Sequence, residues 1–230
     1  MSGRLHGNHL VQVTVLRSVN CFLVREQDGL TLVDTLMTRG NAGEILRAAG
    51  VEGMPIVRIA LTHAHWDHVG ALDALAGELP GAEVCFGERE ARFLAGDRSL
   101  DRDEPAVKPR SMVRARTRPA RLLRPGDRVG SLEVVAAPGH TPGQLAFLDT
   151  RDRTLIAGDA FSTWGGTYVT SKVNPRFPLP TLGTWHRPTA LRTARDLRAL
   201  EPSRLAVGHG RVVERPGEEM DRAIAAATGG

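Results

Sequence analysis

The segment Thr62–His68, with the sequence THAHWDH, concentrates side chains that bind metal ions. Its three histidines and one aspartate lie within six residues, at the spacing H-x-H-x-D-H. Imidazole and carboxylate groups are the usual protein ligands of zinc-like divalent cations. Because side chains alternate along extended backbone, His63 and His65 are expected to point toward one ion. Asp67 and His68 follow where the chain leaves the strand, free to reach a second ion.

Three later residues share this placement at the end of an apolar run, beside glycines. His140 lies in PGHTPG after a predicted strand over 132–136, and Asp159 lies in AGDA after another. His209 lies in GHG after a third apolar run. Glycine allows the backbone to approach such a site closely. Together with the first motif, these positions predict a metal site built from strand ends.

The elements that must position these residues are strands and helices in two successive runs. Alternating or continuous apolar segments predict strands, and amphipathic segments predict helices. Residues 96–119 are the least structured stretch, residues 159–184 form a long loop, and the N-terminus with His6 and His9 is expected to fray. One α/β domain over 1–230 with two packed sheets is the simplest arrangement. The predicted strands are 10–17, 19–26, 30–34, 56–61, 82–86, 132–136, 144–149, 154–157 and 204–207, and the predicted helices are 43–49 (closed by Gly50), 70–79, 88–94, 188–200 and 217–227.

The composition is that of an ordinary globular protein, with 41% hydrophobic and 24% charged residues in a chain of 230. No apolar run reaches membrane-spanning length, and the first residues lack the apolar core of a signal peptide. Cys21 and Cys85 lie in separate apolar runs without a C-x-x-C partner, which predicts buried reduced thiols and a cytoplasmic protein. The net charge of +4 permits an anionic substrate without implying nucleic acid.

The motifs T-H-x-H-x-D-H, P-G-H-T-P-G, G-D and a late G-H-G, in this order, resemble the metallo-β-lactamase-fold hydrolase superfamily. The resemblance extends over nearly the whole chain, beginning at the VNCFLV and LTLVDT segments. It implies an α/β (α+β) fold, a four-layer αββα sandwich, with a dinuclear metal centre between the sheet edges. The implied cofactor is two Zn²⁺ ions, with iron or manganese as alternatives.

The resemblance also implies two sets of metal ligands that share one carboxylate. Two metals about 3.5–4 Å apart can share one water and lower its pKa toward 7. The resulting hydroxide would attack a small ester, lactone or thioester, with Asp67 as the catalytic residue that orients it and carries a proton. The implied ligands are His63, His65 and His140 for the first metal and Asp67, His68 and His209 for the second, with Asp159 bridging both.

Departures from better-known branches of the superfamily leave the substrate open. Asp159 stands where true β-lactamases typically carry cysteine or another residue, which argues against antibiotic hydrolysis. Ser162 replaces the tyrosine that is typical of acyl-homoserine lactonases, and residues 161–164 do not match the persulfide dioxygenase signature. Too few residues follow His209 for the substrate-binding extension of glyoxalase II. A small-molecule substrate is therefore expected; the sequence leaves the oligomeric state open and is compatible with a homodimer.

Two alternatives stay open at the level of sequence. The basic run 108–124, with Arg114, Arg116 and Arg118, would suit a phosphodiesterase or nuclease of the same fold. Because no aromatic residue interleaves with these arginines, a solvated face or pocket rim is favoured and nucleic acid is not the expected partner. The other alternative is an iron-dependent oxidoreductase at the same ligands. In loop 160–185, Tyr168 and Lys172 are the polar candidates for holding a substrate.

Overall fold

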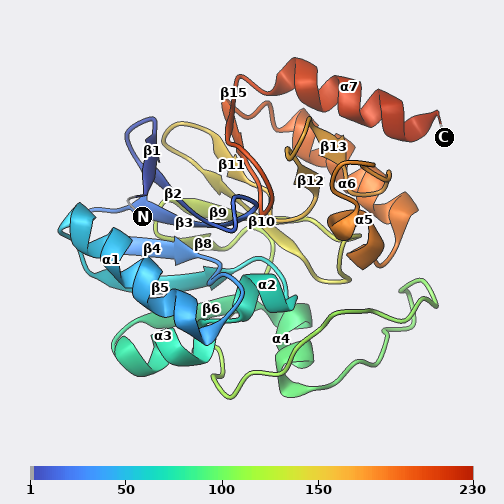
Figure 1. The fold of residues 1–230 in the computed structure, drawn as a ribbon. Helices are drawn as coiled ribbons and strands as arrows, with labels where there is room; N and C mark the ends of the chain where they lie inside the picture. The colour runs from blue at the N-terminus through green and yellow to red at the C-terminus, as the bar shows by residue number, and fades with distance from the viewer. Residues whose placement is uncertain (1–2, 230) are drawn as a thin grey trace.

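The computed structural model describes residues 3–229, which form two facing sheets with helices on their outer sides (Figure 1). The first sheet has the order β1 (Arg4–His6), β2 (Leu10–Val15), β3 (Val19–Arg25), β4 (Leu30–Val33), β5 (Ile56–Leu61), β6 (Glu83–Gly87) and β7 (Arg121–Leu123). The second has the order β15 (Val213–Glu214), β14 (Arg204–Ala206), β11 (Thr154–Ile156), β10 (Leu145–Asp149), β9 (Leu132–Ala136) and β8 (Arg128–Val129). A two-stranded ribbon, β12 (Phe161–Ser162) and β13 (Tyr168–Val169), lies apart from both sheets.

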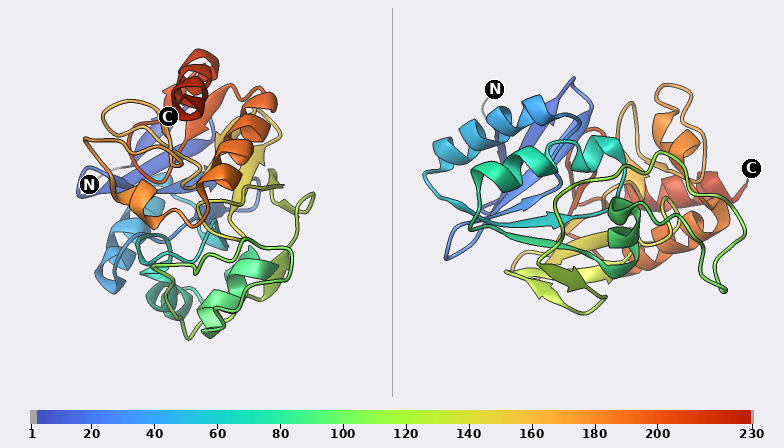
Figure 2. Two further views of the ribbon diagram at one scale, coloured as in Figure 1. Left: turned by 90° about the vertical axis from the view of Figure 1, so that its right-hand side faces the viewer. Right: turned by 90° about the horizontal axis from the view of Figure 1, so that it is seen from below.

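The helices complete a four-layer αββα arrangement, as the resemblance implied. Helices α6 and α7 lie on the opposite side of the sheets from α1 and α3 (Figure 2). The helices are α1 (Ala42–Glu52), α2 (Trp66–Val69), α3 (Leu72–Glu78), α4 (Glu88–Ala95), α5 (Leu179–Gly183), α6 (Arg187–Ala199) and α7 (Gly217–Thr228), with a short 3-10 turn over Arg39–Asn41. None of the helices in the described part of the chain is long and apolar enough to cross a bilayer.

Strand periodicity divides the core into layers. In β3, Cys21 and Leu23 pack in the apolar cluster under α1 and α3, whereas Phe22 and Val24 pack in the cluster between the sheets. Successive side chains of a strand point to opposite faces, so one apolar run serves two layers. A third cluster joins the second sheet to α6 and α7. Cys85 faces the inter-sheet cluster, and both cysteines are free and buried, as predicted.

Several element boundaries differ from the prediction for local physical reasons. Helix α1 runs past Gly50 to Glu52, because the left-handed residue that ends it is Gly53 (φ 68°). The predicted helix 70–79 is the shorter α3 (72–78), and the unpredicted helix α2 (66–69) precedes it. Gly70 lies between the two helices at a close approach to Met37, where a Cβ would lie 1.9 Å from the carbonyl oxygen. The short strands β7, β8, β12, β13 and β15 were not predicted.

The expectation of a frayed N-terminus is wrong from residue 4 onward. Strand β1 pairs antiparallel with β2, and His6 is buried with its Nε2 3.1 Å from Gln12 Oε1. Neither His6 nor His9 belongs to a group of potential metal ligands in the described chain.

The topology places the histidine motifs at one end of the facing sheets. Strands β4, β5, β6 and β7 are parallel, so their C-terminal ends share an edge, and the motif 62–68 follows β5. In the second sheet β11 and β14 are parallel, and Asp159 and His209 follow them. His140 lies in the connection between β9 and β10. The loops that follow both sheets therefore meet at the site.

Candidate metal centre

All seven predicted ligands converge at this end of the sheets. Three overlapping groups have ligand atoms within 4.8 Å of one another. Two of these groups are the sets implied for the first and second metal, and the remaining group links them through Asp159. The groups are His63, His65 and His140; His63, His68 and Asp159; and Asp67, His68 and His209.

In the first set, each histidine contacts a neighbouring oxygen through the ring nitrogen that points away from the site. Its other ring nitrogen points into the site. His65 Nε2 donates to the Arg110 carbonyl at 3.0 Å, which leaves Nδ1 facing inward. His140 Nδ1 lies 3.0 Å from Thr184 Oγ1, a hydroxyl that can donate to the Pro180 carbonyl and so accept from the imidazole. His63 Nδ1 lies 3.0 Å from Thr62 Oγ1. Outer hydrogen bonds of this kind fix the tautomer of metal-binding histidines.

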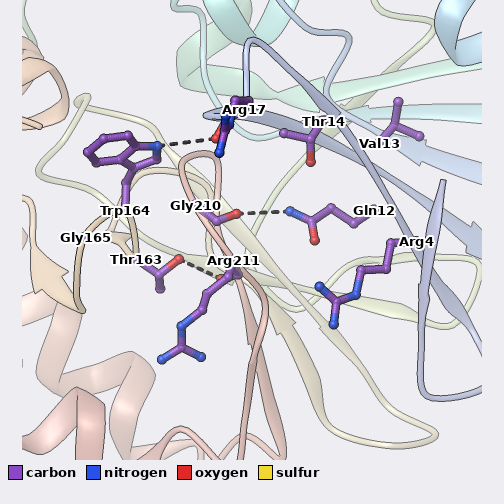
Figure 3. A pocket seen from close by; sticks show the side chains of 10 residues that line it. All are labelled: Arg4, Gln12, Val13, Thr14, Arg17, Thr163, Trp164, Gly165, Gly210 and Arg211. Carbon is purple, nitrogen blue, oxygen red and sulfur yellow. Dashed lines mark hydrogen bonds between the residues drawn. The ribbon is translucent and has the colours of Figure 1, made fainter. Parts of the chain in front are cut away.

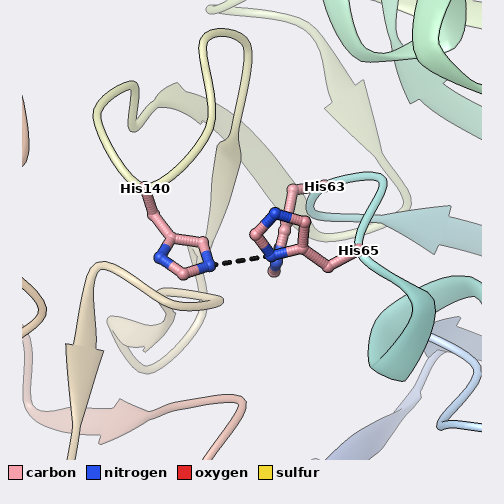
Figure 4. Close-up of side chains that lie close together, drawn as sticks. All are labelled: His63, His65 and His140. Atoms are coloured by element: carbon pink, nitrogen blue, oxygen red, sulfur yellow. Dashed lines mark hydrogen bonds between the residues drawn. The ribbon is translucent and has the colours of Figure 1, made fainter. Parts of the chain in front are cut away.

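The inward nitrogens of His65 and His140 face each other at 3.0 Å (Figure 4). With their outer nitrogens donating, both inward nitrogens carry lone pairs. Burial lowers the pKa of His65 to about 4 and that of His140 to about 3, so neither ring holds a second proton at neutral pH. Two opposed lone pairs repel unless a cation lies between them, which is the chemistry of a metal site.

The second set carries the carboxylates. His68 Nδ1 donates to Asp34 Oδ2 at 2.8 Å, and its Nε2 lies 3.4 Å from Asp159 Oδ1. His209 Nδ1 donates to the Ser18 carbonyl at 3.1 Å. Its Nε2 lies 3.1 Å from Asp159 Oδ2 and 3.3 Å from Asp67 Oδ2. Since Asp159 Oδ2 is also 3.4 Å from His140 Nε2, the Asp159 carboxylate stands between the two sets.

The electrostatics of the two sets differ. Burial disfavours the charged form of His209, but Asp159 and Asp67 outweigh it and raise the pKa of His209 to about 9. Burial likewise opposes ionisation of Asp67, yet His68 and His209 lower the pKa of that carboxyl to about 2. The second set therefore pairs carboxylates with protonated imidazoles. A divalent cation can take the place of such protons, because metal ligands bind in their deprotonated forms.

Three buried atoms support the fit of a metal to these residues. His63 Nε2, His68 Nε2 and Asp159 Oδ1 have no hydrogen-bond partner within residues 3–229. A buried polar atom without a partner costs about 1–3 kcal/mol. All three belong to the predicted ligands and point at one small volume, so cations coordinated there would satisfy them together.

Glycines next to the ligands permit this close packing. A Cβ on Gly208 would lie 2.2 Å from Asp159 Oδ1 and 2.5 Å from His68 Cε1. Gly139 has a φ of 128° and sits against the backbone of α6, where a Cβ would lie 2.2 Å from Ala190 N. Gly208 of GHG is therefore required because a Cβ would clash with two ligands. Gly139 of PGH is required because its backbone has a positive φ.

Asp34 supports both ends of the ligand segment 62–68 and was not predicted from the sequence. Its carboxylate accepts from Thr62 N and Thr62 Oγ1, each at 2.8 Å, as well as from His68. Asp34 itself has a φ of 64°, an uncommon conformation for a residue other than glycine. The available signal was its position directly after the apolar strand β4, which is the rule that identified the other site residues.

Glu90, in the first turn of α4, was also missed. It is fully buried and joins the loops of the two sheets: one oxygen accepts from Ala64 N at 2.8 Å, and the other accepts from Thr141 Oγ1 at 2.7 Å and Gly143 N at 2.9 Å. Burial raises the pKa of Glu90 to about 7, against the three hydrogen bonds that favour its ionised form. No feature of the local sequence distinguishes Glu90 from its acidic neighbours.

Asn20 holds the segment that carries His209. Its side-chain amide donates to the carbonyls of Val207 and Gly210, at 2.9 Å and 2.8 Å, and its backbone N–H donates to Gly208. Asn20 is 1% exposed and also accepts from Gln12 Nε2 at 2.9 Å. The position of His209 therefore depends on a polar network that reaches into β2 and β3.

A hollow of about 330 Å³ opens onto the ligands. Leu16 and Phe177 contribute to its apolar wall, together with Leu179 and Leu182 of α5, and Ser18 is one of its few polar members besides the ligands. Leu16, Leu179 and Leu182 are 73%, 64% and 58% exposed. No arginine or lysine of the described chain lines it. We refer to this hollow as the metal pocket.

Other predicted residues lie elsewhere. Tyr168 and Lys172 do not line the metal pocket, and Lys172 Nζ donates to the Ala226 carbonyl on α7, so their prediction as substrate-holding groups is not supported. The arginines at 114, 116 and 118 are exposed and lie outside the pocket lining, as a solvated face predicts. Segment 96–119 nevertheless borders the site, since Ser111 lines the pocket and Arg110 holds His65.

Comparisons with known proteins agree with the fold and the motifs. The family model described as the metallo-beta-lactamase superfamily matches residues 14–209. An uncharacterized protein of Bacillus subtilis (strain 168), YobT, is 44% identical over 92% of this chain and 91% of its own length. The probable metallo-hydrolase YflN of the same strain is 28% identical, covering 89% and 84%. The acyl-coenzyme A thioesterase MBLAC2 of Gallus gallus is 29% identical, covering 61% and 56%.

Solved structures give the same picture of the fold. A metallo-β-lactamase from Cronobacter sakazakii, a mutant of its HARLDQ motif, aligns with a TM-score of 0.71 at 18% identity, over 99% of this chain and 94% of that chain. A metallo-β-lactamase family protein of Thermus thermophilus aligns with a TM-score of 0.68 at 25% identity, covering 96% and 79%. The chain belongs to the metallo-β-lactamase superfamily and is a metal-dependent hydrolase.

Removing metal should lower the thermal stability of the protein. We expect dialysis against a strong chelator to lower Tm by several degrees, because the cluster of buried imidazoles and carboxylates loses the ions that satisfy it. Adding Zn²⁺, Mn²⁺ or Fe²⁺ in turn should restore Tm, and differential scanning calorimetry measures the size of each recovery. A Tm that is the same with and without chelator would argue against a metal at this site.

Proposed function

We propose that this protein is a dinuclear hydrolase, with zinc as the expected metal, that cleaves a small ester, lactone or thioester. The observation that carries the proposal is the convergence of unpaired ligand atoms from both sheets, with Asp159 between the two sets. His63, His65 and His140 would hold one ion, and Asp67, His68 and His209 the other. Two such ions supply Lewis acidity toward a substrate carbonyl and lower the pKa of a bound water.

Asp67 is the residue best placed to move a proton. Its side chain is 16% exposed and lines the metal pocket, whereas Asp159 is almost completely buried. A carboxylate at this position can accept a proton from the attacking group and pass it to the leaving atom. No serine or cysteine nucleophile is needed for this chemistry.

The wall of the metal pocket favours a substrate with an apolar acyl group. Leu179 and Leu182 present exposed side chains beside the ligands, and Phe177 lies against His209 with ring centroids 5.3 Å apart. Apolar walls with a few convergent polar groups are the usual form of small-molecule sites. The thioesterase activity in the name of MBLAC2 supports the same choice among acyl compounds. The metal pocket is less suited to binding a phosphodiester, since no arginine or lysine among the described residues lines it.

An acyl-chain series tests this proposal. Wild-type protein should hydrolyse p-nitrophenyl esters, thioesters or lactones, with kcat/KM rising from acetyl to hexanoyl, while bis-p-nitrophenyl phosphate stays near background. In the double variant Leu179→Ala/Leu182→Ala, the preference for hexanoyl over acetyl should fall about fivefold to tenfold, since each methylene in apolar contact contributes about 0.8 kcal/mol. Val51→Ala, at an exposed position on α1 away from the pocket, is the matched control. Turnover of the phosphodiester alone would reject the proposal in favour of a phosphodiesterase.

The same arrangement supports two further expectations. We propose that residues 1–230 are one domain, because the ligands come from both sheets and neither half holds a complete set. We also propose a cytoplasmic location, which the two separate, buried and unpaired cysteines support.

A further inference from the structure

A second hollow lies behind the turn between β2 and β3, beside the metal pocket. It has a volume of about 670 Å³ and is lined by strands β1 and β2, the turn itself, the loop after β12 and the segment after His209. Figure 3 shows Arg4, Arg17 and Arg211 around it, with Gln12 and Gly210 between them. We refer to this hollow as the arginine cleft.

The arginine cleft is strongly cationic. Arg4, Arg17 and Arg211 line it, and no aspartate or glutamate is among the described lining residues. Arg211 pairs with Glu219 at 2.7 Å, but Arg4 and Arg17 have no carboxylate partner within residues 3–229. Thr14 and Thr163 add hydroxyl groups to the lining. Guanidinium groups with neighbouring hydroxyls match the oxygens of phosphate, and Arg is the side chain best suited to bind it.

The floor of the cleft is ordered rather than open solvent. Buried Gln12 donates to the Gly210 carbonyl at 3.0 Å and to Asn20 Oδ1 at 2.9 Å. Arg4 pairs with Gln12 across β1 and β2, so both side chains are on one face of the sheet. The cleft therefore has a fixed base of polar groups, on the network that holds His209.

The arginine cleft and the metal pocket share their dividing wall. Leu16 and Ser18 line the metal pocket while Arg17 between them lines the cleft. Likewise, His209 lines the metal pocket and the next residue, Gly210, lines the cleft. On the other side, Trp164 lines the cleft and stacks at 5.4 Å against Phe177 of the metal pocket. The two hollows therefore adjoin on either side of one turn, whose Arg17 carbonyl accepts from Trp164 Nε1 at 3.3 Å.

The conformation of this turn is costly for the residues it contains. Ser18 N donates to the Val15 carbonyl, and Leu16 and Arg17 between them have φ values of 49° and 59°. Two successive positive φ values favour Asn-Gly in such hairpin turns. The strained positions instead carry a leucine that faces the metal pocket and an arginine that faces the cleft. Strain of this kind is retained at functional sites more often than elsewhere.

We propose that the arginine cleft binds a phosphate-bearing part of the substrate's leaving group, while the acyl group occupies the metal pocket. This inference rests on the proposed function and names its substrate class: an acyl ester or thioester whose alcohol or thiol carries phosphate. The volume of the cleft, about twice that of the metal pocket, suits a leaving group larger than the acyl group.

Two thioesters with the same reacting group test the proposal. Butyryl-coenzyme A has a leaving group that carries phosphates, and butyryl-N-acetylcysteamine has a short leaving group without the phosphates, the adenosine and the pantothenate, so the arginine variants isolate the contribution of the phosphates. We expect wild-type protein to have the higher kcat/KM for the coenzyme A thioester, through a lower KM. In Arg4→Gln/Arg17→Gln the ratio of the two kcat/KM values should fall about tenfold or more, as charge-assisted hydrogen bonds are lost. Arg128→Gln, at an exposed position on β8, should leave the ratio unchanged.

The possible outcomes separate the inference from the proposed function. If both thioesters are hydrolysed and the double variant keeps the wild-type ratio, the cleft is no leaving-group subsite and the proposed function stands. Calorimetry with adenosine 3′,5′-bisphosphate tests whether the cleft binds a free anion instead. If the double variant loses this binding but keeps the wild-type ratio of kcat/KM values for the two thioesters, the cleft is a site for free phosphates and the proposal is overturned. If wild-type protein hydrolyses neither thioester, the proposed function fails for thioesters, and the leaving-group role fails with it.

Discussion

Replacing Asp159 with alanine is expected to remove metal from the purified protein and to lower kcat/KM by at least about 100-fold. Asp159 stands between the two ligand sets, within 3.4 Å of His68, His140 and His209. Losing even an outer hydrogen-bond partner of a metal ligand typically costs 10–100-fold in affinity or activity, and a shared ligand should cost more. Metal content by mass spectrometry and steady-state kinetics on the best ester or thioester measure the effect.

The fold should survive this change, which makes the result interpretable. The apolar clusters that hold the layers together do not include Asp159, so the circular dichroism spectrum should match that of chelated wild-type protein. Asp196→Ala, exposed on α6, serves as the control for loss of an aspartate. An Asp159→Ala protein that keeps two metal ions and full activity would refute the bridging role.

Replacing Glu90 is expected to cost both stability and metal affinity. Alanine would leave Ala64 N, Gly143 N and Thr141 Oγ1 without their buried acceptor. At about 1–3 kcal/mol for each of the three unpaired groups, a loss of at least about 3 kcal/mol of unfolding free energy is expected. Because these donors belong to the loops of His63, His65 and His140, metal affinity should fall about 10–100-fold. Denaturant unfolding and metal competition against a fluorescent chelator measure the two effects.

A conservative variant separates positioning from bulk stability. Glu90→Gln keeps the size of the side chain and one acceptor oxygen, so its metal affinity should fall between those of wild type and Glu90→Ala. Glu88→Gln is the matched control, since Glu88 lies on the same turn of α4, is exposed, and pairs with Arg124 on the surface. Surface pairs contribute about 0–1 kcal/mol. If Glu90→Gln and Glu88→Gln bind metal equally well, Glu90 does not position the ligands.

The fold class and the seven candidate ligands were predictable because their signals are local. Apolar strands end two to four residues before His63, His140, Asp159 and His209, and the glycines beside the last three mark close approach. The structure explains one such glycine at Gly208, whose missing Cβ leaves room for Asp159 and His68.

The groups that hold these ligands in place were not predictable, because they lie at distant positions in the sequence or are backbone atoms. Glu90 reaches Ala64 and Thr141, which are 26 and 51 residues away in the chain. His65 is held by a carbonyl, that of Arg110, which any residue type can supply. The division of the site into a metal pocket and an arginine cleft also depends on the positive φ values of Leu16 and Arg17, where the sequence carries no glycine.

The metal content of the purified protein, measured by inductively coupled plasma mass spectrometry on the same sample that is assayed, decides whether this chain carries a dinuclear hydrolytic centre. The proposed site holds two ions in sets that share Asp159, so about two zinc ions per chain with ester, thioester or lactone hydrolysis are expected. Two manganese or iron ions with the same activity would change the metal and keep the site. One iron per chain with no hydrolysis of any substrate would contradict the account and indicate an iron-dependent oxidoreductase.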